Sequence, residues 1–214
     1  MTDRHQPQLY LVTPPAFEPA AFAPLVEEAL AAGPVACLQL WAPETDEDGL
    51  RTAAKALRDI VQGRGTAFLI NGHVKLAAYL GCDGVHLDRA GAKEVAAAKK
   101  ALGDDAIVGV SARVSRHDAM VAAEAGADYV SFGPVFDSAT KDLPADPAAL
   151  QAIEWWGEMM ETPCVAVGGI TPDNLARPVR AGADFVCAVS AVWDHPDGPG
   201  AAVRAFAKAL DAAG

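Results

Sequence analysis

Cysteine is scarce in this sequence, and its four copies lie far apart. Cys37, Cys82, Cys164 and Cys187 form no CxxC pair, and three of them lie in apolar runs typical of strands. The spacing excludes a disulfide framework. We expect buried, reduced thiols in a cytoplasmic protein.

Long apolar runs are also missing. A membrane-spanning helix needs about 18 or more consecutive apolar residues, and the sequence has no such run. The first six residues, MTDRHQ, are polar and lack the apolar core of a signal peptide. These absences support the cytoplasmic assignment and predict no membrane partner.

Positive charge is in short supply. Lysine and arginine together number 17 against 28 acidic residues, so the net charge is −11. An acidic chain repels nucleic acids and anionic membranes at long range, so we expect neither as a partner. A phosphorylated small molecule would have to be bound locally, by backbone N–H groups and one or two cations.

The 214 residues are 51% apolar, which suits one domain over residues 1–214. Short apolar segments alternate with helical patterns eight times, and parallel strands buried under helices have this composition. The alternation predicts a single (β/α)₈ barrel. A doubly wound open sheet is the alternative, but the even unit length and the lack of an early GxGxxG count against it. The expected strands are 9–13, 35–40, 66–70, 84–87, 107–111, 129–132, 163–167 and 185–189.

One phrase recurs before three of the expected strands. A glycine that ends a helix is followed by a small residue and an aspartate in 81–85, 126–130 and 182–186. The repeat indicates that one βα unit is reused along the chain.

The segment from Pro163 to Asn174 contains the most informative pattern. A buried strand runs into Gly168-Gly169, and Pro172-Asp173 predict the start of a helix. Glycines at such a junction leave backbone N–H groups free, and these groups bind phosphate. Barrels commonly hold phosphate after their last two strands, where Gly168-Gly169 and Ser190 lie. The other interpretation is a plain strand-to-helix turn.

Seven short motifs stand at or near the ends of the expected strands. They are LYLVT at 9–13, GVHL at 84–87, GVSA at 109–112, GADYV at 126–130, FGPVF at 132–136 with Thr140-Lys141, VGGI at 167–170, and VSA at 189–191. Each motif is weak alone, but their order and positions are specific. Together they resemble the thiamine phosphate synthase family, including its thiazole tautomerase branch, and the likeness covers almost the whole chain.

The resemblance implies a reaction and a set of roles. In the synthases, an aminopyrimidine loses pyrophosphate to form a cation, which the nitrogen of a thiazole phosphate captures, with Mg²⁺ and basic side chains neutralising the pyrophosphate. Lys141 and Ser111 would be catalytic and, with Thr140, would face the pyrophosphate. The implied substrate-binding set is Gln39 and Asn71 on the pyrimidine side, and Gly168, Gly169, Val189 and Ser190 around the thiazole phosphate.

The sequence departs from the family pattern where pyrophosphate and metal would bind. Trp41 and Pro43 stand where the family has Arg and Lys, and Gly72 replaces a metal-binding aspartate. The second metal carboxylate, after the fourth strand, is also lost, although Asp88 or Arg89 could compensate in part. We therefore expect no metal residues here and absent or weak Mg²⁺ binding.

The tautomerase branch places a histidine just after its fifth strand, where this chain has Arg113, a poor proton shuttle. His73 is the other candidate base, and His86 fits a hydrogen-bonded core histidine better than a catalyst. Three functions stay open: a synthase, a thiazole phosphate tautomerase, and a non-catalytic or repurposed barrel that binds a phosphorylated ligand. A homo-oligomer is possible in each.

Overall fold

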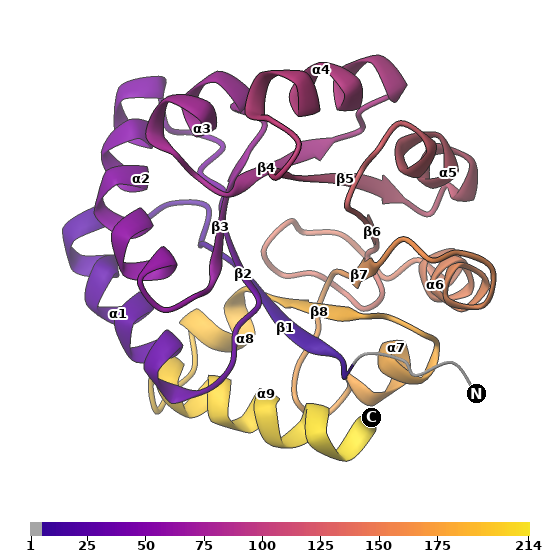
Figure 1. Cartoon of the computed structure of the whole chain (residues 1–214). Coiled ribbons are helices and arrows are strands. Elements are labelled where there is room, and N and C mark those ends of the chain that lie inside the picture. The colour runs from indigo at the N-terminus through magenta and orange to yellow at the C-terminus, as the bar shows by residue number, and fades with distance from the viewer. Residues whose placement is uncertain (1–5) are drawn as a thin grey trace.

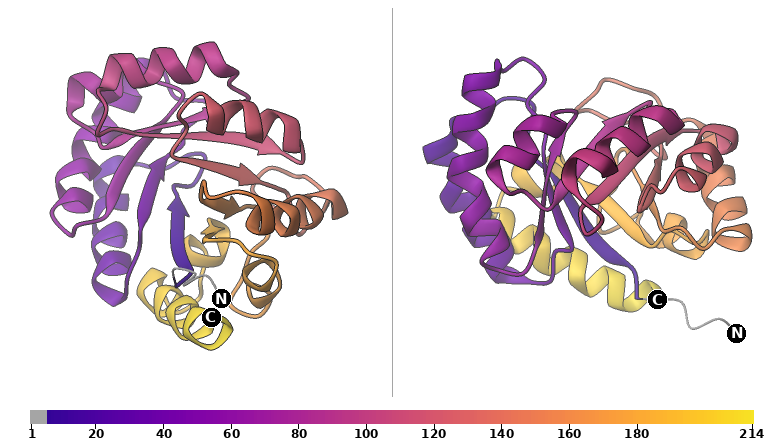
Figure 2. Two further views of the ribbon diagram at one scale, coloured as in Figure 1. Left: turned by 45° about the vertical axis from the view of Figure 1, so that its right-hand side comes forward. Right: turned by 45° about the horizontal axis from the view of Figure 1, so that its top comes forward.

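The computed structural model, which describes residues 6–214, is a closed barrel of eight parallel strands in sequential order, β1 to β8. Figure 1 shows the helices forming an outer ring around the strands, and Figure 2 gives two further views. The predicted (β/α)₈ fold is confirmed. The polar start of the chain, on which the expectation of no signal peptide depends, lies mostly in residues 1–5, outside the described range.

The strand bounds are β1 Gln8–Val12, β2 Cys37–Leu40, β3 Ala67–Asn71, β4 Gly84–Asp88, β5 Ile107–Arg113, β6 Tyr129–Phe132, β7 Cys164–Ala166 and β8 Phe185–Ala188. The helix bounds are α1 Pro19–Ala32, α2 Glu47–Gln62, α3 Val74–Leu80, α4 Ala92–Leu102, α5 Arg116–Glu124, α6 Pro147–Met159, α7 Ala176–Arg180, α8 Ser190–Trp193 and α9 Pro199–Ala213.

Strand side chains divide between two cores because neighbouring residues of a strand point to opposite faces. Leu9 and Leu11 of β1 pack in the large core between barrel and helices. Tyr10 and Val12 belong to the smaller core inside the barrel, together with Tyr129 of β6. The polar hydroxyls of the two tyrosines are therefore enclosed by the barrel, where they need hydrogen-bond partners.

The repeated aspartates have one shared structural task at the N-terminal end of the barrel. Oδ2 of Asp83, which precedes β4, accepts the backbone N–H of Phe68 at 2.7 Å. Oδ2 of Asp128 accepts from Val108 at 2.6 Å, and Oδ2 of Asp184 accepts from Cys164 at 2.8 Å. Each aspartate thus binds an amide near the start of the preceding strand, which explains the repeat as a stability feature.

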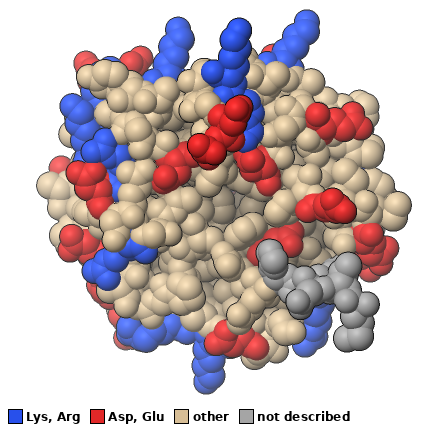
Figure 3. Space-filling view, viewed as in Figure 1, with Lys and Arg blue, Asp and Glu red and all other residues tan. Residues whose placement is uncertain are grey.

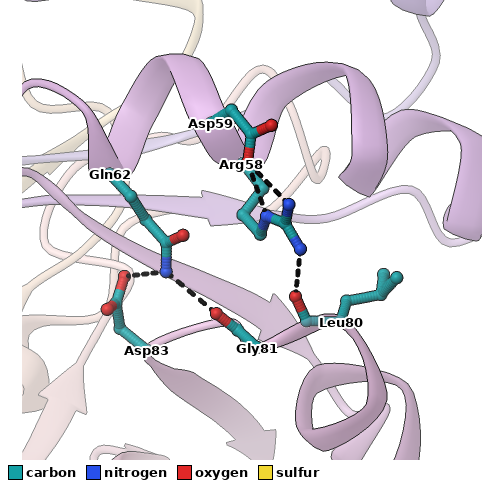
Figure 4. Close-up of polar contacts among 6 residues, drawn as sticks. All are labelled: Arg58, Asp59, Gln62, Leu80, Gly81 and Asp83. Carbon is teal, nitrogen blue, oxygen red and sulfur yellow. Dashed lines mark hydrogen bonds and ion pairs between the residues drawn. The ribbon is translucent and has the colours of Figure 1, made fainter.

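Asp83 also connects the barrel to the helix layer. Gln62 of α2 donates from Nε2 to Asp83 Oδ2 at 3.0 Å and to the carbonyl of Gly81 at 3.0 Å (Figure 4). In the same view Arg58 donates to the carbonyl of Leu80, the last residue of α3. These contacts fix the end of α3 and the start of β4 against α2.

Two details differ from the sequence-based expectations. Pro172 and Asp173 were expected to open the helix after β7, but they lie in a turn, and α7 begins at Ala176. The short helix α8, at Ser190–Trp193, was not expected. Indole Nε1 of Trp193 donates to the carbonyl of Val12 at 2.7 Å, which ties α8 to the end of β1.

Charged side chains are spread over the surface. On the face shown in Figure 3, lysine and arginine lie mainly along the outline, and several acidic side chains lie nearer the centre. Within residues 6–214, none of the helices has the length and apolar character needed to cross a bilayer.

Candidate active site

A cavity of about 440 Å³ opens at the C-terminal ends of the strands. Its walls come from the barrel interior, from the loop after β6, which crosses the barrel in Figure 1, and from the residues that follow β7 and β8. Of the predicted site residues, those that line the cavity are Gln39, Ser111, Thr140, Lys141, Gly168, Gly169, Val189 and Ser190. The topology therefore brings these residues to one place, as expected of a barrel.

Residues after β7 and β8 line this cavity with backbone N–H groups that have no partner in the described part of the chain. In the described part of the chain, the N–H groups of Gly168, Gly169, Ile170, Ser190 and Ala191 have no hydrogen-bond acceptor. All five residues line the cavity. Amides left free beside open space are suited to oxyanions such as phosphate.

Asn174 holds the β7 loop in this conformation. Its Oδ1 accepts the N–H of Thr171 at 2.9 Å, and its Nδ2 donates to the carbonyl of Gly169 at 2.9 Å. Gly168 and Gly169 have φ angles of 102° and 62°, which L side chains rarely adopt. A Cβ on Gly169 would also lie 2.3 Å from the carbonyl oxygen of Asp137. Glycine is required here by both conformation and space.

A chain of hydrogen bonds crosses the barrel beneath the cavity. Tyr10 donates its hydroxyl proton to Gln39 Oε1 at 2.9 Å. Gln39 Nε2 donates to Asn71 Oδ1 at 2.8 Å, and Asn71 Nδ2 donates to Asp88 Oδ2 at 3.2 Å. Asn71 itself does not line the cavity. Its amide instead fixes the orientation of Gln39.

The other end of the chain fixes the tautomer of His86. Because the Tyr10 hydroxyl proton goes to Gln39, the Tyr10 oxygen accepts from Tyr129, whose hydroxyl oxygen lies 2.8 Å away. Tyr129 must then accept from Nδ1 of His86, 2.8 Å from its oxygen. His86 consequently carries its proton on Nδ1. Its Nε2 is an unprotonated acceptor on a residue of the cavity wall.

Burial favours the neutral form of this imidazole. It lowers the pKa of His86 to about 4, with nearby Lys141 acting in the same direction and Asp88 opposing it. Burial likewise raises the pKa of the Tyr10 and Tyr129 hydroxyls well above the usual value. The imidazole and the two phenols of the network are therefore uncharged near neutral pH. His86 was expected to be a hydrogen-bonded core residue, and its burial and its bond to Tyr129 agree with that.

We predict an acid-dependent loss of stability caused by His86. Its pKa is lower in the folded chain than in the unfolded chain, so unfolding takes up a proton between about pH 6.5 and pH 4. Stability is full above this window and falls through it, by about 3 kcal/mol in total. Asparagine can replace the Nδ1 donor without titrating. The unfolding free energy of His86→Asn, measured by urea denaturation across this range, should fall less steeply.

A control variant distinguishes this effect from general acid unfolding. His117 is exposed on α5, and His117→Asn should retain the wild-type pH dependence. Parallel curves for wild type and His86→Asn would contradict the assigned effect.

Lysine and tryptophan meet at the cavity mouth. Nζ of Lys141 lies 4.8 Å from the centroid of the Trp41 ring, within the range of a cation–π contact. The backbone of Trp41 is fixed because its N–H donates to Oγ1 of Thr13 at 2.9 Å. Burial raises the pKa of Cys187 to about 12 against an opposing effect of Lys141, and burial lowers the pKa of His86 with Lys141 adding to it, so the lysine charge acts on the interior of the barrel mouth. Trp41 thus provides a platform for the lysine.

The carboxylates of the cavity do not fit a magnesium site held by the protein. Within residues 6–214, no three histidine, cysteine or acidic side chains group together as metal ligands. Only Asp88 and Asp137 bring carboxylates to the cavity wall of the described chain. Asp88 accepts from Asn71, and Asp137 Oδ1 accepts the N–H of Ala145 at 2.8 Å. Magnesium prefers near-octahedral oxygen ligands, and position 72, a glycine, supplies no side chain.

Some candidate residues lie elsewhere, and others were not anticipated. His73 is exposed at the start of α3 and does not line the cavity, and Arg89 does not line it either. Arg113, expected only as a poor substitute for histidine, does line it. Tyr10 and Tyr129 occur within the recognised motifs, but their roles in the network depend on which strand residues face inward. The two-residue alternation of the strands was the one sequence signal that could have placed these tyrosines inside the barrel.

Comparison with known proteins identifies the family of this chain. The family model described as thiamine monophosphate synthase matches residues 9–192. This chain belongs to that family. The thiamine-phosphate synthase of Rhodospirillum centenum is 48% identical over 203 residues, covering 95% of this chain and 97% of the relative. That of Hyphomonas neptunium is 46% identical, covering 96% of both chains.

A solved structure supports the same assignment. Thiamine phosphate pyrophosphorylase from Pyrococcus furiosus superposes with a TM-score of 0.80 at 26% identity, covering 98% of each chain. Family membership therefore supports thiamine phosphate synthase function in thiamine biosynthesis. The resemblance found in the strand-end motifs is confirmed, and the departures at positions 41, 43 and 72 are variations within the family.

Proposed function

We propose that this protein is a thiamine phosphate synthase that binds a thiazole phosphate and couples it to hydroxymethylpyrimidine pyrophosphate. In this reaction the bond between the pyrimidine methylene carbon and the pyrophosphate oxygen breaks. The thiazole nitrogen donates its electron pair to that carbon, and pyrophosphate leaves with the bonding electrons. The protein must therefore hold two anionic groups within one cavity.

The observation that carries the proposal is the set of free amides after β7 and β8. Gly168, Gly169 and Ser190 present N–H groups without acceptors in residues 6–214, beside the cavity that Lys141 and Ser111 also line. A phosphate bound at these amides would leave the thiazole ring directed toward the barrel axis. The Lys141 ammonium would remain free to meet the second anion.

The interior network matches the other substrate. Gln39, oriented by Asn71, and His86, whose Nε2 is an acceptor, provide fixed polar groups on a wall that is otherwise largely apolar. Flat heterocycles bind well in pockets of this type. We assign the pyrimidine to this region.

Proton transfer on a thiazole phosphate is the second candidate. One observation favours it: His86 is neutral, has an unprotonated Nε2, and belongs to the cavity wall. Against it, a basic group with a pKa near 4 has little driving force for accepting a proton at neutral pH. His73 lies outside the cavity and does not supply the missing base.

A two-substrate assay tests the proposal. We expect the purified protein to form thiamine phosphate and release pyrophosphate when both substrates are supplied, with magnesium present and with the metal chelated by EDTA. Absence of product in both conditions would reject the synthase. Deuterium exchange into the thiazole phosphate would then indicate the isomerase. If only a rise in melting temperature with thiazole phosphate remained, the barrel would be a binding protein.

A further inference from the structure

The leaving pyrophosphate is an anion, and the residues that follow β2 supply no positive charge to neutralise it. Position 41 is tryptophan and position 43 is proline, so neither contributes a cation. The cavity carboxylates do not form a magnesium site, and Asp88 and Asp137 add negative charge to the wall. In the part of the chain that the structure describes, Lys141 and Arg113 are the lysine and arginine residues lining the cavity.

Arg113 occupies an unusual backbone position that brings it to this cavity. It is the last residue of β5, and the register between β5 and β6 shifts between Ser111 and Arg113. Its φ angle is 52°, in the left-handed region that non-glycine residues seldom occupy. Its carbonyl accepts the N–H of Gly133 at 3.0 Å, which links it to the start of the β6 loop. A non-glycine residue in such a conformation commonly marks a functional site.

The side chain of Arg113 is available for a ligand. It is exposed, and within residues 6–214 its guanidinium makes no hydrogen bond or ion pair. Ser111, two residues earlier, and Lys141 line the same cavity. A guanidinium binds phosphate oxygens through two parallel N–H groups, which a lysine cannot do.

We propose that Arg113 binds and neutralises the leaving pyrophosphate, together with Lys141, as a cation supplied from β5 in place of the missing residues after β2. This inference rests on the proposed synthase function, because it names the group that stabilises the leaving anion. It assigns Arg113 direct contact with the substrate. It also predicts that pyrophosphate binding does not depend on a protein-held metal.

Titration calorimetry with inorganic pyrophosphate tests the proposal on the intact chain. In EDTA the wild type should bind pyrophosphate, and Arg113→Gln should weaken that binding by at least about 10-fold, the loss expected for a charge-assisted contact. Arg113→Lys should recover part of it. Arg89→Gln is the matched control because Arg89 directly follows β4 and also has a φ of 52° but lies outside the cavity, so the pyrophosphate affinity of this variant should stay unchanged.

Further outcomes separate this inference from the proposed function. If the wild type forms thiamine phosphate while Arg113→Gln has wild-type pyrophosphate affinity, the inference is wrong and the synthase stands. If pyrophosphate binds only with magnesium, the inference is also wrong. If Arg113→Gln loses pyrophosphate affinity but the wild type forms no product, the contact between Arg113 and pyrophosphate stands, whereas the synthase and the role of Arg113 toward a leaving group are both rejected. Thiazole phosphate should raise the melting temperature of Arg113→Gln as in wild type, which confirms an intact fold.

Discussion

Replacing Lys141 with methionine should lower the kcat for thiamine phosphate formation by about 100- to 1,000-fold, as for removal of a charge that stabilises a transition state. The Lys141 ammonium lies over the Trp41 ring at the cavity mouth. Negative charge on the pyrophosphate increases as the carbon–oxygen bond breaks, so we expect the lysine to stabilise the transition state more than the bound substrate. The effect should therefore appear mainly in kcat, measured by steady-state kinetics with both substrates saturating.

The fold of the loop should survive this change. Ser138 and Leu143 form a backbone bridge, and Asp137 accepts the N–H of Ala145, so the loop does not depend on the lysine. Thiazole phosphate should still raise the melting temperature of Lys141→Met. Lys100→Met, which changes an exposed side chain on α4, is the control and should retain wild-type kcat. A kcat within about threefold of wild type for Lys141→Met would exclude a catalytic charge at this position.

Replacing Ser190 with aspartate should weaken thiazole phosphate binding by about 100-fold or more, because like charges placed together cost several kcal/mol. Ser190 lines the cavity beside the free amides of Gly168, Gly169 and Ala191. A carboxylate here would repel the phosphate and would itself accept the amide hydrogens. Binding is measured by calorimetry with the thiazole phosphate alone, so that the second substrate does not contribute.

Asparagine at the same position is the matched control. Asparagine has nearly the shape of aspartate but no charge, so Ser190→Asn should lose much less affinity than Ser190→Asp. Equal losses in the two variants would indicate a steric effect and would move the phosphate site away from these amides. Wild-type affinity in Ser190→Asp would also move the proposed phosphate site away from these amides.

The barrel was predictable because each strand can be recognised from its local sequence. Runs such as 9–13 and 107–111 are short, apolar and bounded by turn residues, and their eightfold alternation with helices permits few architectures. The start of α7 was misplaced because Pro172 and Asp173 resemble a helix opening, whereas Asn174 uses its side chain to close a turn there. Side-chain hydrogen bonds of this kind compete with helix formation and are hard to rank from sequence.

The site was predictable in its position and less so in its contacts. Strand-end residues such as Ser111 and Gly169 converge in any barrel, so their meeting follows from topology. The direction of the hydrogen bonds from His86 to Asp88 needed coordinates, because it depends on which residues face inward and how six side chains pair. Arg113 was not predicted as a cavity residue, because the register shift between β5 and β6 that accompanies its place on the wall cannot be read from the sequence pattern.

The aspartates that precede β4, β6 and β8 bind backbone amides at the N-terminal end of the barrel, at the opposite end of the strands from the cavity. The contacts that stabilise the barrel and the residues that line the cavity thus lie at opposite ends of the same strands. Trp41 and Gly72 lie at the open end of the barrel, and substitutions there leave the aspartate contacts unchanged. Residues around the cavity can therefore change during evolution while the contacts that stabilise the barrel stay the same.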